Sequence, residues 1–86
     1  MTKRLELFEH AKTACGRLLT QRPSNPAVKS IVSQLDYLID LEEGTSSDRT
    51  RLKDITIGVL AAREIEPLDM EIAEILHAVA GEARRM

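Results

Sequence analysis

The residues of this chain that could perform chemistry are few and scattered. Its two histidines, His10 and His77, lie far apart in the sequence, and both are expected on polar helix faces. Glu6 and His10 are spaced by four residues, a pairing more often seen in surface contacts than in metal ligation. No CxxC, HExxH or glycine-rich phosphate loop occurs. The sequence therefore predicts neither a metal site nor a bound cofactor.

The lone cysteine and the carboxylate pairs add little to this chemistry. Cys15 falls on an apolar helix stripe, so we expect a buried structural thiol rather than a nucleophile, although Thr13 and Arg17 are close in sequence. Asp36 and Asp40 could in principle act as a general acid and a general base, but two carboxylates at this spacing far more often belong to an exposed helix face. We predict that the chain is not an enzyme.

Surface side chains in the segment after Pro26 give a stronger functional signal. Tyr37 and Leu41 fall on the side of this segment away from Leu35, where we expect them to be exposed. Small polar and acidic residues surround them. An exposed aromatic and aliphatic pair within a polar rim is typical of a protein-binding patch. An isolated exposed apolar residue is also common and has no function by itself.

Four helices must position these side chains. The first is expected from about Thr2 to Gln21 and ends before Pro23. Asn25 and Pro26 have the types of an N-cap and first residue for the second helix, and Gly44 those of its left-handed C-cap. The third is expected over 48–64, and the last begins after an Asp69 N-cap. The fold class predicted is all-α: a small up-down four-helix bundle with short loops, one domain spanning 1–86.

The third predicted helix is apolar almost all the way round. Its main stripe is expected to contain Leu52, Ile55, Val59 and Ala62. A second stripe with Ile57, Leu60 and Ala61, extended by Glu64, is a secondary interface candidate. Gly58 in the middle of a helix usually permits the close approach of another helix.

Composition sets further bounds. The 86 residues are 43% hydrophobic with only two aromatic side chains, which favours a core of packed helices over a sheet. One cysteine, no signal peptide and no long apolar run lead us to expect a cytoplasmic protein. From Ser30 to Asp48 the chain carries five acidic residues and no Lys or Arg. Such a segment disfavours a nucleic-acid partner and suits a basic protein surface.

The segment from about Gln34 to Leu76 resembles a known family. The resemblance is carried by Gln34-Leu35-x-Tyr37-Leu38, Asp48-Arg49-x-x-Leu52-x-x-Ile55-Thr56-Ile57-Gly58, Ala61, Glu64 and Asp69-x-Glu71-Ile72, in that order and spacing. These residues are similar to those of small helical immunity proteins that protect bacteria against type VI secretion effectors with NAD(P)+ glycohydrolase activity.

The resemblance implies a non-catalytic protein that binds a cognate toxin and blocks its dinucleotide cleft. The resemblance assigns no contact residues, so the expected toxin-binding residues come from the helical position of the patch described above, with Tyr37 also part of the resemblance. These are Ser33, Asp36, Tyr37, Asp40, Leu41 and Glu43. An acidic surface of this kind would compete with dinucleotide phosphates for an electropositive cleft.

Three other interpretations stay open. The chain could be an immunity protein for a different toxin activity on the same scaffold, or a self-associating helical adaptor whose third helix is buried in a homodimer. A helix-turn-helix regulator has little support, because no helix after a tight turn presents a basic face.

Overall fold

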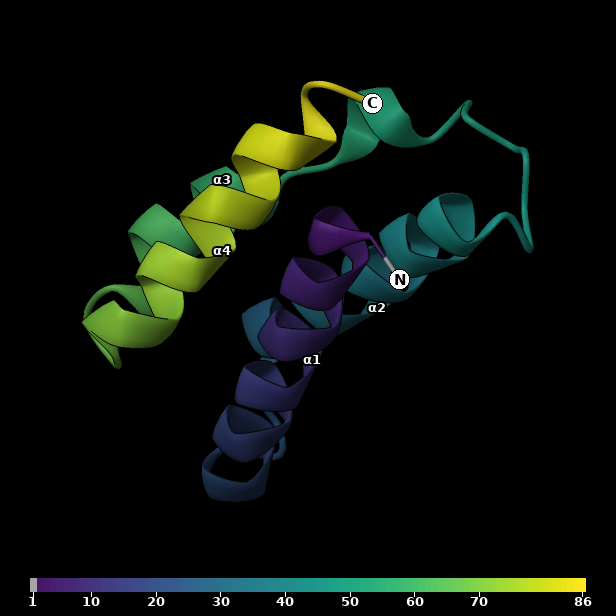
Figure 1. Cartoon of the computed structure of the whole chain (residues 1–86). Coiled ribbons are helices and arrows are strands. Elements are labelled where there is room, and N and C mark those ends of the chain that lie inside the picture. Colours follow the sequence, from purple (N-terminus) through teal and green to yellow (C-terminus); the bar gives the residue numbers. More distant parts are fainter. Residues whose placement is uncertain (1) are drawn as a thin grey trace.

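The computed structural model describes residues 2–86, and all of their regular secondary structure is helical. The helices are α1 (Lys3–Gln21), α2 (Pro26–Glu43), α3 (Ile57–Leu60) and α4 (Met70–Ala83), with a 3₁₀ turn η1 (Leu52–Asp54) and a π-helical turn η2 (Ala61–Ile65). Figure 1 shows two helical hairpins, α1 with α2 and α3 with α4, joined by one long connection. The all-α fold class with four helices is confirmed.

Local capping chemistry explains why three of the helices begin where they do. The hydroxyl of Thr2 accepts a hydrogen bond from the amide of Leu5 at 2.9 Å, and Asn25 accepts from the amides of Ala27 and Val28. Asp69 accepts from the amide of Ile72 at 3.1 Å. These side chains satisfy amides that have no partner within the helix. Gly44 ends α2 with φ of +83°, the left-handed conformation expected of it.

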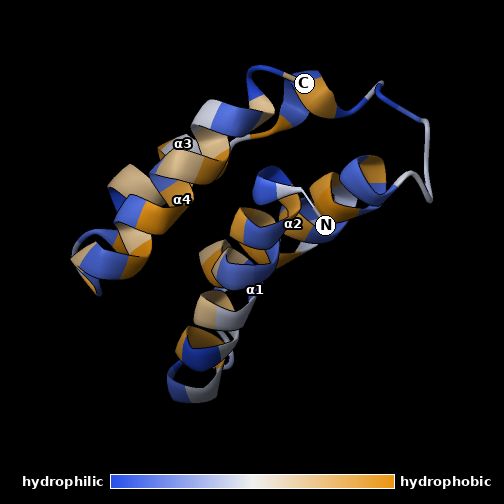
Figure 2. Cartoon of the chain, in the orientation of Figure 1, coloured by the Kyte–Doolittle hydropathy of each residue, from blue (hydrophilic) through white to orange (hydrophobic). Residues whose placement is uncertain are grey.

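The third helix differs from the prediction. The chain from Gly44 to Thr56 is a connection with only the η1 turn in it, and α3 starts at Ile57 rather than near Asp48. The connection is therefore longer than the expected polar turn, and it is drawn largely in hydrophilic colours (Figure 2). The helix then widens into η2, where the amide of Glu66 bonds the carbonyl of Ala61 at 2.9 Å, five residues back.

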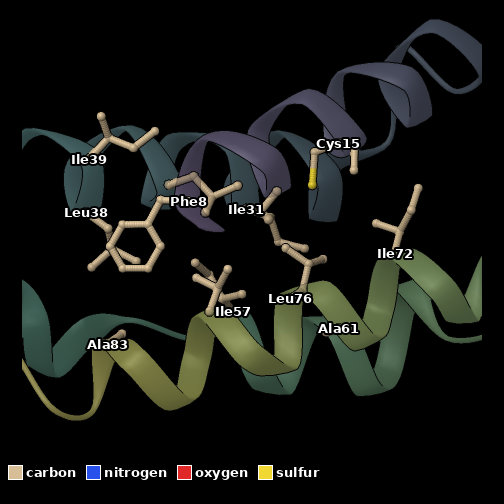
Figure 3. Packing of buried hydrophobic residues seen from close by; sticks show 14 of the residues in the cluster. Phe8, Cys15, Ile31, Leu38, Ile39, Ile57, Ala61, Ile72, Leu76 and Ala83 are labelled. Carbon is tan, nitrogen blue, oxygen red and sulfur yellow. The ribbon is translucent and has the colours of Figure 1, made fainter. Parts of the chain in front are cut away.

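The core lies between the two hairpins. Phe8, Ile31 and Leu38 from the first hairpin lie opposite Ile57 and Leu76 from the second, and all five side chains have no exposed surface (Figure 3). Cys15 is equally buried, as predicted, and burial raises the pKa of its thiol to about 11. The pairing of α1 with α2, of α3 with α4, and of α1 with α4 completes the bundle.

A polar cluster closes the end of the bundle where α1 begins. The guanidinium of Arg4 contacts the carboxylates of Glu82, at 3.0 Å, and Glu42, at 3.4 Å. The hydrogen bond that Arg4 donates to Glu82 raises the pKa of Arg4, and the Thr2 hydroxyl donates to Glu42 at 2.7 Å. One arginine thus connects α1, α2 and α4. None of the helices in residues 2–86 has the length and hydropathy needed to cross a bilayer.

Candidate functional site

The predicted binding patch on α2 divides into exposed and buried members. Ser33, Asp36, Asp40 and Glu43 are exposed. Their spacing of three or four residues places them along one side of α2. They form a row of three carboxylates and one hydroxyl, which we call the acidic face.

The expected exposure of Tyr37 and Leu41 is wrong. Each side chain is only 8% exposed and belongs to the hydrophobic core cluster. The reason is the connection after Gly44. The Tyr37 hydroxyl donates to the carbonyl of Asp48 at 2.7 Å and accepts from the amide of Arg51 at 3.3 Å. The connection therefore covers the side of α2 that a helical wheel leaves open.

Tyr37 holds this connection by its ring as well as by its hydroxyl. The guanidinium of Arg51 lies 4.9 Å from the ring centroid, a cation–π distance. The carboxylate of Asp48 accepts from the amide and the hydroxyl of Thr50, which lowers the pKa of Asp48. The aromatic side chain that was predicted to bind a partner thus binds the chain's own backbone.

Gln34 is a second anchor that the sequence prediction did not assign to any structural role. Its amide oxygen accepts from the amide of Thr56 at 2.8 Å, and its amide nitrogen donates to the Thr56 hydroxyl at 2.9 Å. Because Thr56 stands at the start of α3 and makes no side-chain cap itself, Gln34 caps that helix from α2. The resemblance motif Gln34-Leu35-x-Tyr37-Leu38 therefore combines core residues with both anchors of the connection.

The carboxylates of the acidic face differ in their surroundings. Asp36 forms an ion pair with Lys12 of α1, Nζ to Oδ1 2.6 Å, and this bond raises the pKa of Lys12. About half of each side chain is exposed, so the pair contributes little to stability. Asp40 accepts a hydrogen bond from the Thr45 hydroxyl at 3.3 Å, and Glu43 makes no ion pair among residues 2–86. The negative charge of the face is thus concentrated toward the end of α2.

The secondary interface candidates are mostly core residues. Ile57 and Ala61 have no exposed surface and pack inside the bundle (Figure 3), so these two candidates are not available to a partner. Leu60 is half-buried and Glu64 is exposed. These two line a shallow hollow of about 450 Å³ together with Asn25, Pro26, Ala27 and Ser30.

The two stripes of the third helix have exchanged their roles. Val59 and Ala62 were expected to face the core, yet both are exposed, and Val59 is 55% exposed. Leu52 and Ile55 do pack against the core, but from the connection and not from α3. Leu52 and Ile55 are not in the same helix as Val59, because α3 begins only at Ile57. The helical wheel that placed Leu52 and Val59 on one side therefore does not apply.

Histidines and carboxylates do not gather into a metal site in the described part of the chain. Within residues 2–86, no three His, Cys, Asp or Glu side chains gather in a cluster that could hold a metal ion. His77 bonds Glu66, Nε2 to Oε2 2.8 Å, in a partly exposed pair between η2 and α4, and His10 is exposed on α1. The exposed polar side chains, among them those of the acidic face, are available for contact with a partner.

The fold and this surface define a small all-α protein with a row of exposed carboxylates on one helix. The family model Tsi6 matches residues 3–85, and the chain belongs to the Tsi6 family. This match confirms the family to which the sequence resemblance assigned the chain.

Two solved structures are similar over nearly the whole chain. A chain of the structure of Tse6 in complex with Tsi6 has 24% sequence identity and a TM-score of 0.91, over 98% of this chain and 89% of that one. Tsi6 from Pseudomonas aeruginosa has 25% identity and a TM-score of 0.87, over 96% and 95% of the two chains. No curated protein matches the sequence.

Proposed function

We propose that this chain is an immunity protein that binds a cognate type VI effector toxin, an NAD(P)+ glycohydrolase, and blocks its active-site cleft. The observation that carries the proposal is membership of the Tsi6 family over residues 3–85. A Tsi6 structure in which Tsi6 is bound to Tse6 supports a protein partner. In this role the chain is a cytoplasmic binding protein and performs no catalysis.

We propose the acidic face as the toxin-binding surface. Asp36, Asp40 and Glu43 present carboxylates on one side of a rigid helix, and Ser33 adds a small polar contact. A cleft that binds a dinucleotide pyrophosphate is electropositive, so a row of carboxylates steers association and competes with the phosphates. Tyr37 and Leu41 contribute to this surface indirectly, because they hold the helix and the connection in place.

The test is consumption of NAD+ by the effector domain encoded beside this gene, measured with and without one equivalent of the protein. We expect stoichiometric inhibition by the wild type. The double variant Asp40→Lys, Glu43→Lys should associate at least about tenfold more slowly, and its on-rate should depend less on salt. Glu71→Lys with Glu74→Lys, an exposed pair on α4 with the same spacing of three residues, is the matched control because it changes the net charge by the same amount.

Each part of the proposal has its own contradicting result. If a complex forms but NAD+ loss continues unchanged, the toxin has another activity or is bound away from its active site. If the double variant keeps the on-rate and salt dependence of the wild type, the acidic face does not steer binding. If no complex forms, a self-associating adaptor becomes the better interpretation.

A further inference from the structure

The outer side of the α3–α4 pair carries an apolar surface that the proposed function does not use. Val59 is 55% exposed, and it lines two adjoining hollows of about 170 and 470 Å³. Both hollows also include Gly58, Ala80 and Arg84, so they form one continuous shallow groove. We call this groove with its rim the Val59 surface.

The groove follows from how closely the two helices pack. A methyl group placed on Gly58 would lie 3.1 Å from Cβ of Ala80, so the helices approach each other at the limit of contact. Because Gly58 and Ala80 have small side chains or none, the floor of the groove between α3 and α4 is apolar and lies close to the two backbones. Val59 of α3 and Ala62 of η2 then lie along one edge of the groove. Such an exposed apolar patch with a polar rim is typical of an interaction site.

The positive charge at the rim of the groove indicates which kind of partner segment could bind there. Among residues 2–86, two arginines, Arg63 and Arg84, and the imidazole of His77 line the groove, and no carboxylate lines it. Neither arginine forms an ion pair within those residues. The imidazole of His77 bonds the carboxylate of Glu66 at 2.8 Å. The groove therefore fits an apolar side chain flanked by carboxylates.

A second copy of this chain fits the groove poorly. A symmetric contact between two Val59 surfaces would bring the same arginines face to face, which costs binding energy. A contact between the Val59 surface and the acidic face of another copy is complementary in charge. It is not symmetric, however, and would build an open chain of molecules unless it closed into a ring.

We propose that the Val59 surface is a second contact for the effector, and that it holds an effector segment presenting an apolar side chain flanked by carboxylates. The proposal rests on the proposed function. The immunity protein then meets its effector with two surfaces of opposite charge, the acidic face on α2 and the Val59 surface on α3 and α4. A non-cognate effector that matched only one of them would bind weakly.

The experiment measures the affinity of the effector domain for two variants, Val59→Ser and the double variant Arg63→Glu, Arg84→Glu. We expect each to weaken binding by about tenfold or more, the size typical of an interface anchor. All three positions are exposed, so the fold should be kept, and thermal unfolding checks this. Met70→Ser is the matched apolar control because Met70 is 53% exposed and lies outside the groove. Arg22→Glu with Lys29→Glu, also exposed, is the charge control.

The outcomes separate this inference from the proposed function. If the wild type binds the effector and both groove variants bind equally well, the Val59 surface is not a contact and the immunity role stands. If the wild type does not bind, both proposals fail together. A dimer of the wild type that Val59→Ser dissociates, or a DNA duplex that binds only while the arginines are present, would assign the groove to another partner and overturn the proposal.

Discussion

The α1–α2 hairpin and the stretch from Gly44 to Ile65 are stabilised by different kinds of interaction. The hairpin has two regular helices of 19 and 18 residues, each begun by a side chain of its own N-cap. The second stretch has three 3₁₀, four α-helical and five π-helical residues, and none of these turns begins with a side-chain cap of its own N-cap residue. It is also attached to α2 and to the end of the chain, through Gln34, Tyr37 and the carbonyl of Met86, which accepts from Arg49 at 2.8 Å.

The difference shows that the helices of the hairpin are specified mainly by their own sequence, whereas α3 depends on contacts with other elements. An amphipathic helix with its own caps is specified by local sequence and needs only an apolar surface to pack on. A helix as short as α3 is not stable by itself, because nucleation costs more than a few hydrogen bonds return. It forms where other elements supply its caps and its packing. Substitutions in the two regions should therefore have separable effects.

The largest expected effect tests which side of α3 faces the core. Ile57→Ala removes a fully buried side chain and should lower the free energy of unfolding by about 2–5 kcal/mol. Val59→Ala, two residues away but exposed, should change it by less than about 0.5 kcal/mol. Chemical denaturation of both variants measures the contrast. Equal losses would mean that both sides of α3 are packed, contrary to the structure.

A pair of glycines gives the next comparison. Gly16 lies in α1 with open space around it, whereas a methyl group on Gly58 would meet Ala80. Gly16→Ala should stabilise the protein by about 0.5–1 kcal/mol through helix propensity. Gly58→Ala should destabilise it by about 1 kcal/mol, since forcing the two helices apart outweighs the same gain.

A second substitution can relieve the clash expected in Gly58→Ala. Ala80→Gly removes the methyl group that Gly58→Ala would meet, so the double variant should recover part of the packing loss. Thermal unfolding of the single and double variants gives the coupling energy. Strict additivity of the two substitutions would show that the 3.1 Å approach is not what limits position 58.

Tyr37→Phe tests the attachment of the connection to the hairpin. The variant keeps the buried ring but loses the hydroxyl that bonds the carbonyl of Asp48 and the amide of Arg51. We expect a loss of about 1 kcal/mol in stability. Amide hydrogen exchange should quicken at Arg51 while the amides within α1 and α2 are affected only through global opening. An unchanged exchange rate at Arg51 would mean that this hydroxyl does not hold the connection.

Gln34→Ala should have the smallest effect of the four. It removes two hydrogen bonds to Thr56 at a partly exposed position, so we expect a cost of about 0.5 kcal/mol. The loss should appear as faster hydrogen exchange in the first turn of α3. Lys29→Ala, at an exposed position of the same helix, should leave that exchange unchanged and is the control.

The candidate site was only partly predictable for a related physical reason. The acidic face was found because exposed carboxylates on a long regular helix follow from the helical period alone. Tyr37 and Leu41 were misplaced because the period shows which residues share a side, but not which other segment covers that side. Val59, Arg63 and Arg84 were missed because their surface exists only when α3 and α4 pack through Gly58 and Ala80.

The sequence by itself determined the hairpin, the caps at Asn25, Gly44 and Asp69, and the all-α class. Each of these depends on interactions between residues close in the chain. Only the tertiary structure decided where α3 begins, which of its sides is buried and what Tyr37 bonds. Those features depend on contacts between residues at least 11 positions apart in the chain. A pattern of neighbouring residues carries no information on the energies of such contacts.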